Sequence, residues 1–162
     1  MNKLWFEKKS SVHGSGLFAS RNIKKGLKII EYIGDKVTKR EGDRRADKQI
    51  SKAIKNKNNG MVYIFELNKR YDIDGSVKYN HARLINHSCN PNCEVEIDDN
   101  KLWILAIKNI KKNTELSYNY GYAYDDDYVD HICQCGSSKC VGYILDEDHW
   151  PCLLYTSDAA DE

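Results

Sequence analysis

Short runs in which apolar and polar residues alternate dominate this chain, and they predict strands rather than long helices. Residues 61–67 read MVYIFEL, so every second side chain would share one face of a strand. Residues 94–97 and 102–107 flank Asp98-Asp99-Asn100, which predicts a hairpin. Repeated short strands with few helical patterns favour a β-rich α+β fold.

A repeated phrase marks two further turns. NIKK occurs at 22–25 before Gly26 and at 109–112 before Asn113, each time leading into a strand candidate. Glycine and asparagine both tolerate the left-handed backbone conformation, so we expect both residues to end the same kind of turn. The first turn would join a strand in GSGLFAS to the apolar run at 27–33.

One helix is predicted, at the start of a polar insertion. Thr38 and Glu41 have the spacing of a capping box, which predicts a short charged helix ending near Lys48. The residues from there to Gly60 are rich in lysine and asparagine and offer few apolar anchors. We therefore interpret residues 38–60 as a variable, solvated insertion.

Composition limits the function classes. At 162 residues the chain has the size of one domain, and 25 Lys and Arg against 24 Asp and Glu leave a formal charge of +1. This balance argues against nucleic-acid binding, including binding by a small zinc ribbon. The sequence has no signal-peptide pattern and no apolar stretch of membrane-spanning length. We therefore expect a soluble, intracellular monomer without membrane contact.

Three cysteines are spaced like metal ligands. Cys133, Cys135 and Cys140 follow a C-x-C-x4-C pattern with Gly136 inside. In a reducing compartment such clustered thiols favour a metal over disulfides. Structural zinc takes four ligands, so one ligand is missing from this cluster. By spacing alone, the candidates for the fourth ligand are Cys89, Cys93, His131 and His149.

Three other patterns carry little information separately. Asn86-His87 is an ordinary turn pair, and Gly14-Ser15-Gly16 lacks the rest of a dinucleotide fingerprint. Tyr118 and Tyr120 alternate along a strand, which is a common packing stripe. None of these patterns identifies an enzyme by itself, but their order along the chain is informative.

In chain order, GSGLFA, EYIGD, RLINHSCNPN, ELSYNY and CQCGSSKCVG resemble the motifs of SET-domain protein-lysine methyltransferases with a cysteine-rich post-SET segment. The resemblance spans residues 8–146 and is nearest to compact, single-domain bacterial versions. It implies several small β-sheets around a knot-like substructure, a fold of the β-clip type, with a zinc-bound post-SET loop. The segments that cross in this knot would be 83–91 and 115–120.

The resemblance also divides the chain. Residues 1–125 would form the SET domain, and residues 126–146 would form the zinc-binding post-SET segment. Residues 147–162 share no pattern with the rest, and the ending PCLLYTSDAADE resembles a translated sequencing adaptor. We therefore expect this tail to be disordered.

The family match implies which residues bind the cofactor and the metal. The residues expected to contact S-adenosylmethionine are Ser15, Gly16, Arg83, Asn86, His87 and Tyr120. The absence of a glycine side chain would let the cofactor approach the backbone. The zinc ligands implied by the family are Cys89, Cys133, Cys135 and Cys140, while Cys93 remains the alternative from spacing.

The implied activity is S-adenosylmethionine-dependent N-methylation of a lysine in a protein or peptide, whether a histone or another protein. Tyr120 would lie nearest the methyl transfer, with Tyr118 and Tyr63 lining a lysine channel, and Tyr143 could fold over it. Because Tyr118 keeps a hydroxyl where the family alternates between tyrosine and phenylalanine, we expect mono- or dimethylation.

One alternative stays open, a catalytically silent SET-like module that contains zinc and binds a peptide. The expected compartment is the cytoplasm for a prokaryotic source. It is the nucleus for a eukaryotic source or for an enzyme that acts on a host.

Overall fold

The computed structural model describes residues 2–55 and 62–153. Its strands are β1 Trp5–Lys9, β2 Ser15–Ala19, β3 Lys28–Tyr32, β4 Asp35–Thr38, β5 Ile64–Glu66, β6 Tyr71–Asp74, β7 Asn86–His87, β8 Cys93–Asp98, β9 Lys101–Ala106 and β10 Ser117–Tyr118. Its helix is α1 Lys39–Lys55, and its 3-10 turns are η1 His81–Leu84, η2 Tyr128–Asp130 and η3 Glu147–His149. No described helix is long and apolar enough to cross a membrane.

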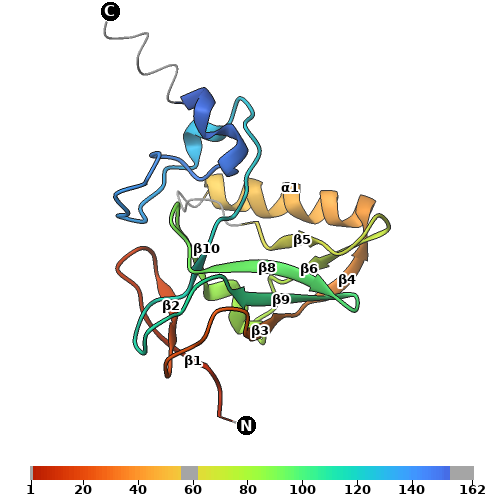
Figure 1. The fold of residues 1–162 in the computed structure, drawn as a ribbon. Helices are drawn as coiled ribbons and strands as arrows, with labels where there is room; N and C mark the ends of the chain where they lie inside the picture. Colours follow the sequence, from red (N-terminus) through yellow and green to blue (C-terminus); the bar gives the residue numbers. More distant parts are fainter. Residues whose placement is uncertain (1, 56–61, 154–162) are drawn as a thin grey trace, which may run out of the picture.

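The described strands form four small sheets rather than one large one. Three sheets are antiparallel, with orders β1-β2, β3-β9-β8 and β4-β6-β5, and the fourth is the parallel pair β7-β10. Figure 1 shows α1 above the β4-β6-β5 sheet and the C-terminal segment, in blue, beyond β10. This arrangement confirms the expected β-rich fold of several small sheets.

The predicted hairpin is present as β8 and β9. Its register pairs Asp98 with Lys101, and the two residues between them, Asp99 and Asn100, have φ values of 48° and 56°. Positive φ at both central positions is the geometry of a two-residue hairpin turn whose twist matches the strands. Asp and Asn supply this conformation at low cost.

The two NIKK segments lie together and form equivalent turns. Gly26 has φ 88° and Asn113 has φ 68°, which confirms the expected left-handed residues. Ile23 and Ile110 each donate a backbone hydrogen bond to the other, both of 2.8 Å. The two flanking bonds are equivalent as well, from Lys25 N to Asn109 Oδ1 and from Lys112 N to Asn22 Oδ1, each 2.9 Å. The first turn does connect β2 to β3, but these strands belong to different sheets.

The predicted helix is longer than expected. It begins after Thr38, whose Oγ1 accepts a hydrogen bond of 3.4 Å from Glu41 N, but it continues to Lys55 rather than ending near Lys48. Gln49 explains the extension, because its amide donates to Asp74 and accepts from Tyr63 N at 2.8 Å. The insertion is therefore anchored to the sheet by polar contacts, which an apolar pattern does not reveal.

The strand expected at 61–67 is shorter than its alternation suggests. β5 covers Ile64–Glu66. The carbonyl of Tyr63 still accepts from Gly75 N at 2.8 Å, but its N–H donates to Gln49 Oε1 instead of to a strand. Met61 lies outside the described residues.

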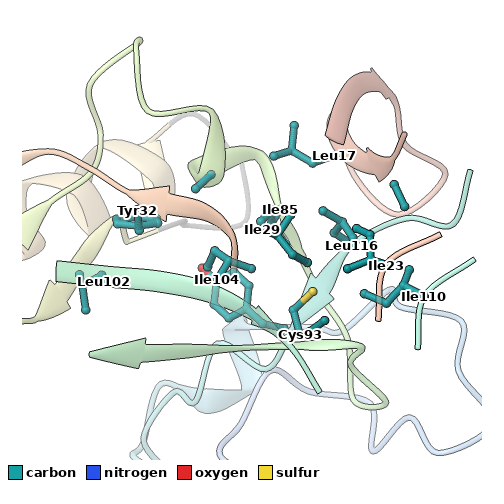
Figure 2. Close-up of a cluster of buried hydrophobic side chains, with 14 of the residues drawn as sticks. Leu17, Ile23, Ile29, Tyr32, Ile85, Cys93, Leu102, Ile104, Ile110 and Leu116 are labelled. Atoms are coloured by element: carbon teal, nitrogen blue, oxygen red, sulfur yellow. The ribbon is translucent and has the colours of Figure 1, made fainter. Parts of the chain in front are cut away.

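The core lies on one face of the β3-β9-β8 sheet. Along β9 the burial alternates, so that Leu102, Ile104 and Ala106 face inward. Figure 2 shows the aliphatic side chains that meet them, from Leu17, Ile23, Ile29, Ile85, Ile110 and Leu116. Each fully buried Leu or Ile contributes roughly 1.5–3 kcal/mol. Ile85 and Leu116 come directly before β7 and β10, so the core holds both strands of the parallel pair.

The C-terminal segment keeps its structure past residue 146. η3 is capped by Asp146, whose Oδ1 accepts a hydrogen bond from Asp148 N at 3.0 Å. Trp150 Nε1 donates to the carbonyl of Leu145 at 3.3 Å. The expectation of disorder from residue 147 thus differs from the structure for 147–153, and residues 154–162 lie outside the described part.

Candidate active site and metal centre

The site is built around the parallel pair β7-β10. In this pair Asn86 lies opposite Ser117, and His87 lies opposite Tyr118. Asn92 links the ends of the pair, because its side chain donates to Glu115 O at 2.8 Å and accepts from Ser117 N at 2.9 Å. The two segments that were expected to meet, 83–91 and 115–120, are therefore side by side.

The carboxylate of Glu115 joins three segments. Its Oε1 accepts hydrogen bonds from Ser10 Oγ at 2.7 Å and from Asn86 Nδ2 at 2.8 Å. A Cβ added at Gly16 would meet the same oxygen at 2.4 Å. Gly16 therefore makes room for Glu115, and close approach of the cofactor to its backbone stays a prediction.

Asn86 extends this junction to the Gly14-Ser15-Gly16 turn. Its Nδ2 lies 3.2 Å from the carbonyl of His13 and 3.4 Å from that of Ser15. Gly14 has φ 51° with open space around a Cβ, so its backbone conformation is what requires glycine. The expected cofactor residues Ser15, Gly16 and Asn86 therefore lie together around Glu115.

His87 connects Tyr120 to Cys89. The backbone N–H of Tyr120 donates to His87 Nδ1 at 3.1 Å, and burial lowers the pKa of His87 to about 4. A neutral imidazole that accepts at Nδ1 carries its proton on Nε2. That Nε2 lies 3.5 Å from Cys89 Sγ, so the imidazole donates toward the sulfur.

Three tyrosines continue from β10 in alternation. The ring centroids of Tyr118 and Tyr120 are 5.0 Å apart, and those of Tyr120 and Tyr122 are 5.8 Å apart. Burial raises the pKa of all three phenols, well above the ordinary value for Tyr118 and Tyr120. They are neutral at physiological pH and can form hydrogen bonds and aromatic walls, but they cannot act as phenolate bases.

The hydroxyl of Tyr120 has a defined partner. It donates to the carbonyl of Ile85 at 2.9 Å, directly before β7. Tyr63, the third expected channel residue, lies near enough to contribute to the raised pKa of Tyr118 and Tyr120. Its carbonyl accepts from Tyr32 Oη at 3.1 Å, which anchors this segment to β3.

Two clefts meet at the tyrosines in the described part of the chain. The first is lined by Val12, His13, Asn86, His87, Tyr120, Tyr122, His131, Ile132, Gln134 and Ile144. The second is lined by Ile50, Val62, Ile64, Phe65, Glu66, Tyr118, Tyr120, Gly121, Tyr122, Ala123, Asp125 and His131. The residues common to both are Tyr120, Tyr122 and His131.

Several expected site residues do not line either cleft, namely Ser15, Gly16, Arg83 and Tyr63. Arg83 is half-buried, and its Nε is the buried side-chain nitrogen that has no hydrogen-bond partner among the described residues. Of the three residues common to both clefts, two were missed from the sequence, Tyr122 and His131. Tyr122 continues the alternation of Tyr118 and Tyr120, which could have identified it, whereas His131 was considered only as a metal ligand.

Four cysteine sulfurs gather beside this site. The Sγ atoms of Cys89, Cys133, Cys135 and Cys140 all lie within 4.8 Å of one another, and those of Cys89 and Cys133 are 3.7 Å apart. Tetrahedral zinc with Zn–S bonds of about 2.3 Å needs sulfurs about 3.8 Å apart. Backbone N–H groups point at two sulfurs, from Cys135 to Cys133 and from Gly142 to Cys140, both at 3.4 Å. This donor set fits a structural zinc ion.

The other candidate ligands lie elsewhere. Cys93 is in the aliphatic core, where burial raises the pKa of its thiol to about 12 and its Sγ donates to Asn92 Oδ1. The His149 ring stacks on Tyr124 at 6.0 Å, and the His131 ring contacts Tyr122 at 4.9 Å. Neither histidine belongs to the sulfur cluster.

Comparison with known families identifies the fold. The model of the SET domain matches residues 14–121, which include β2, β7 and β10 and end just after Tyr120. The chain belongs to the SET-domain family. The sulfur cluster extends beyond the matched region, because Cys133, Cys135 and Cys140 follow it, while Cys89 lies within the SET domain itself.

Curated relatives share this domain. The chain is 36% identical over 141 residues to "Histone-lysine N-methyltransferase, H3 lysine-4 specific" of Aspergillus oryzae, which covers 84% of the chain and 11% of the relative. It is 34% identical over 154 residues to "Histone-lysine N-methyltransferase set-2" of Caenorhabditis elegans, covering 89% and 10%. It is 34% identical over 136 residues to "Histone-lysine N-methyltransferase 2D" of Homo sapiens, covering 82% and 2%.

The chain thus spans about a tenth or less of the length of these relatives. They are fungal and animal proteins, whereas the sequence motifs suggested compact bacterial members of the family. That finer expectation stays a prediction.

Proposed function

We propose that this SET domain is an S-adenosylmethionine-dependent protein-lysine N-methyltransferase. The observation that carries the proposal is the meeting of two clefts at Tyr120, one lined by the Asn-His turn and one by aromatic side chains. A transferase that joins two substrates needs a site of this kind, where both can approach one point from different sides. The relatives named histone-lysine N-methyltransferases support the same activity.

The first cleft is the proposed cofactor site. Its lining combines the polar side chains of Asn86 and His87 with the aromatic rings of Tyr120 and Tyr122, a mixture that is usual for small-molecule sites. When bound there, S-adenosylmethionine would supply a methyl group activated by a sulfonium. Asn86 and His87 would hold it from β7.

The second cleft is the proposed entry for the substrate lysine. Tyr118, Tyr120 and Phe65 give it aromatic walls, and its lining contains carboxylates but no lysine or arginine. Burial against such walls disfavours an ammonium ion, so it lowers a lysine pKa from its ordinary value of about 10.4 and favours the free amine. Because the tyrosines stay neutral, their role would be to hold and orient this amine.

The size of the channel would limit the number of methyl groups transferred. Tyr118 is buried at the bottom of the aromatic stripe, with its ring 6.0 Å from Phe65. Its hydroxyl occupies space that a methylated amine would need. We therefore propose mono- or dimethylation as the main outcome.

A zinc ion held by Cys89, Cys133, Cys135 and Cys140 is the proposed structural metal. It would link the C-terminal segment to the residue that contacts His87, because Cys89 Sγ lies next to the imidazole. Hydrogen bonds of this kind orient a metal ligand and its neighbour together.

The test is transfer of label from S-adenosylmethionine to a panel of histones including H3, DNA-packaging proteins and whole-cell lysate. We expect label on a lysine, and Tyr120→Phe should reduce turnover by roughly a hundredfold or more while cofactor binding persists. Tyr124→Phe is the control, because Tyr124 lies outside both clefts. Peptide binding without any label would instead support the catalytically silent module.

A further inference from the structure

His131 holds a position that the cofactor and lysine sites share. Among the three residues common to both clefts, Tyr120 and Tyr122 follow β10, whereas His131 comes from the C-terminal segment beside Cys133. The metal-binding segment therefore contributes a side chain to the junction between the clefts.

The position of His131 is fixed by its backbone. Its carbonyl accepts from Ile144 N at 2.8 Å, and its N–H donates to the carbonyl of Tyr128 at 3.1 Å. The next residues continue this pairing, with a bridge between Ile132 and Tyr143. His131 is thus held in a short antiparallel pair within the segment.

The side chain of His131 supports an aromatic wall. Its ring meets that of Tyr122 edge-on, with centroids 4.9 Å apart and an interplanar angle of 71°. Tyr122 in turn contacts Tyr120 at 5.8 Å. A substitution at residue 131 would therefore alter the packing of Tyr120 through the ring of Tyr122.

We propose that His131 is a specificity-determining residue that closes the junction between the two clefts and holds Tyr122 against Tyr120. It restricts the space around the amine from the C-terminal segment, so it influences both cofactor affinity and the number of methyl groups accepted. This inference rests on the proposed function, its first part on cofactor binding in the first cleft and its second part on methyl transfer, and cofactor affinity is measurable without turnover.

The experiment compares His131→Ala and His131→Phe in the zinc-loaded full chain. His149→Ala is the matched control, because His149 is also half-buried in the same segment and also contacts a tyrosine, but it lies outside both clefts. Affinity for S-adenosylhomocysteine is measured by calorimetry. Product methylation is measured by mass spectrometry on whichever panel protein the wild type labels, and thermal unfolding checks the fold.

We expect His131→Ala to weaken S-adenosylhomocysteine binding by about two- to tenfold, the size expected for one edge-to-face contact. It should also raise the fraction of more highly methylated product, and His131→Phe should restore both properties because it keeps an aromatic edge. If His131→Ala matches the wild type in affinity and product state, or if His149→Ala has the same effect, the inference is wrong. A wild type that labels nothing contradicts the proposed function, but the calorimetric comparison still tests His131.

Discussion

Two regions of this molecule are held together by different forces. The β3-β9-β8 region buries a continuous set of aliphatic side chains, whereas in the described part of 126–153 Leu145 is the fully buried apolar residue. The second region instead supplies three sulfurs, from Cys133, Cys135 and Cys140, to a cluster that Cys89 completes. The Asn86-His87 turn lies between the two regions, with Ile85 in the core on one side and Cys89 in the cluster on the other. The proposed zinc would thus order the wall that the second region adds to the site, whereas the first region is held by its aliphatic core.

Removal of the metal should have the largest effect, and it should affect the second region much more than the first. Without zinc the C-terminal segment has too little apolar burial to stay ordered, so we expect methyl transfer to fall at least about a hundredfold. Hydrogen exchange should show lost protection in 126–153 and retained protection in β9. Cys135→Ser should reproduce this result, while Cys152→Ser, outside the cluster, should not. Full activity of protein shown to be metal-free would contradict the dependence.

Ile104→Ala should instead destabilise the β3-β9-β8 region. The residue is completely buried in the core, so the cavity should lower the free energy of unfolding by about 2–5 kcal/mol. Ile97→Ala in the neighbouring strand is the control, because Ile97 is 52% exposed. Denaturant titration measures both. Equal losses for the two variants would mean that the aliphatic cluster is not the main source of stability.

Glu115→Ala should affect the contacts of Asn86, in the turn that lies between the two regions. It removes the acceptor for Ser10 Oγ and Asn86 Nδ2, and leaving such groups unpaired costs about 1–3 kcal/mol. We expect the KM for S-adenosylmethionine to rise more than kcat falls, because Asn86 lines the first cleft. Glu115→Gln keeps an oxygen acceptor and should recover most of the affinity. A loss of kcat alone would exclude this positioning role.

Tyr118→Phe should give the smallest change. Removing one hydroxyl leaves the aromatic wall intact and adds a little space, so stability and cofactor affinity should stay nearly unchanged while the product shifts toward higher methylation. Mass spectrometry of a time course measures the shift. Efficient trimethylation by the unaltered protein would show that this hydroxyl does not restrict the channel.

Local patterns predicted much of the fold. The β8-β9 hairpin and the paired turns at Gly26 and Asn113 depend on the backbone preferences of a few adjacent residues. These preferences follow directly from the residue types. The order of the motifs placed 83–91 beside 115–120, although no periodicity could have shown it. The same order selected Cys89 over Cys93, and the structure puts Cys89 with the other sulfurs.

The missed features depend on polar contacts between distant segments. Gln49 extends α1 because it binds Tyr63 N and Asp74. Gly16 leaves space for the side chain of Glu115, which is about a hundred residues away in the sequence. His131 lines both clefts because backbone hydrogen bonds within the C-terminal segment hold it there. The sequence of this segment has almost no hydrophobic pattern. Such contacts leave little trace in the alternation of apolar and polar residues.

The reciprocal bonds between Ile23 and Ile110 have a consequence for synthesis on the ribosome. These bonds join turns near opposite ends of the SET domain, so the loop between them must close before either turn is satisfied. Contacts of such sequence separation slow folding, and a nascent chain cannot make them until residue 110 has emerged. Until then Ile23 lacks its partner and Leu17 lacks Leu116. The nascent chain therefore exposes apolar surface until both segments have been made, which makes it a candidate for chaperone binding.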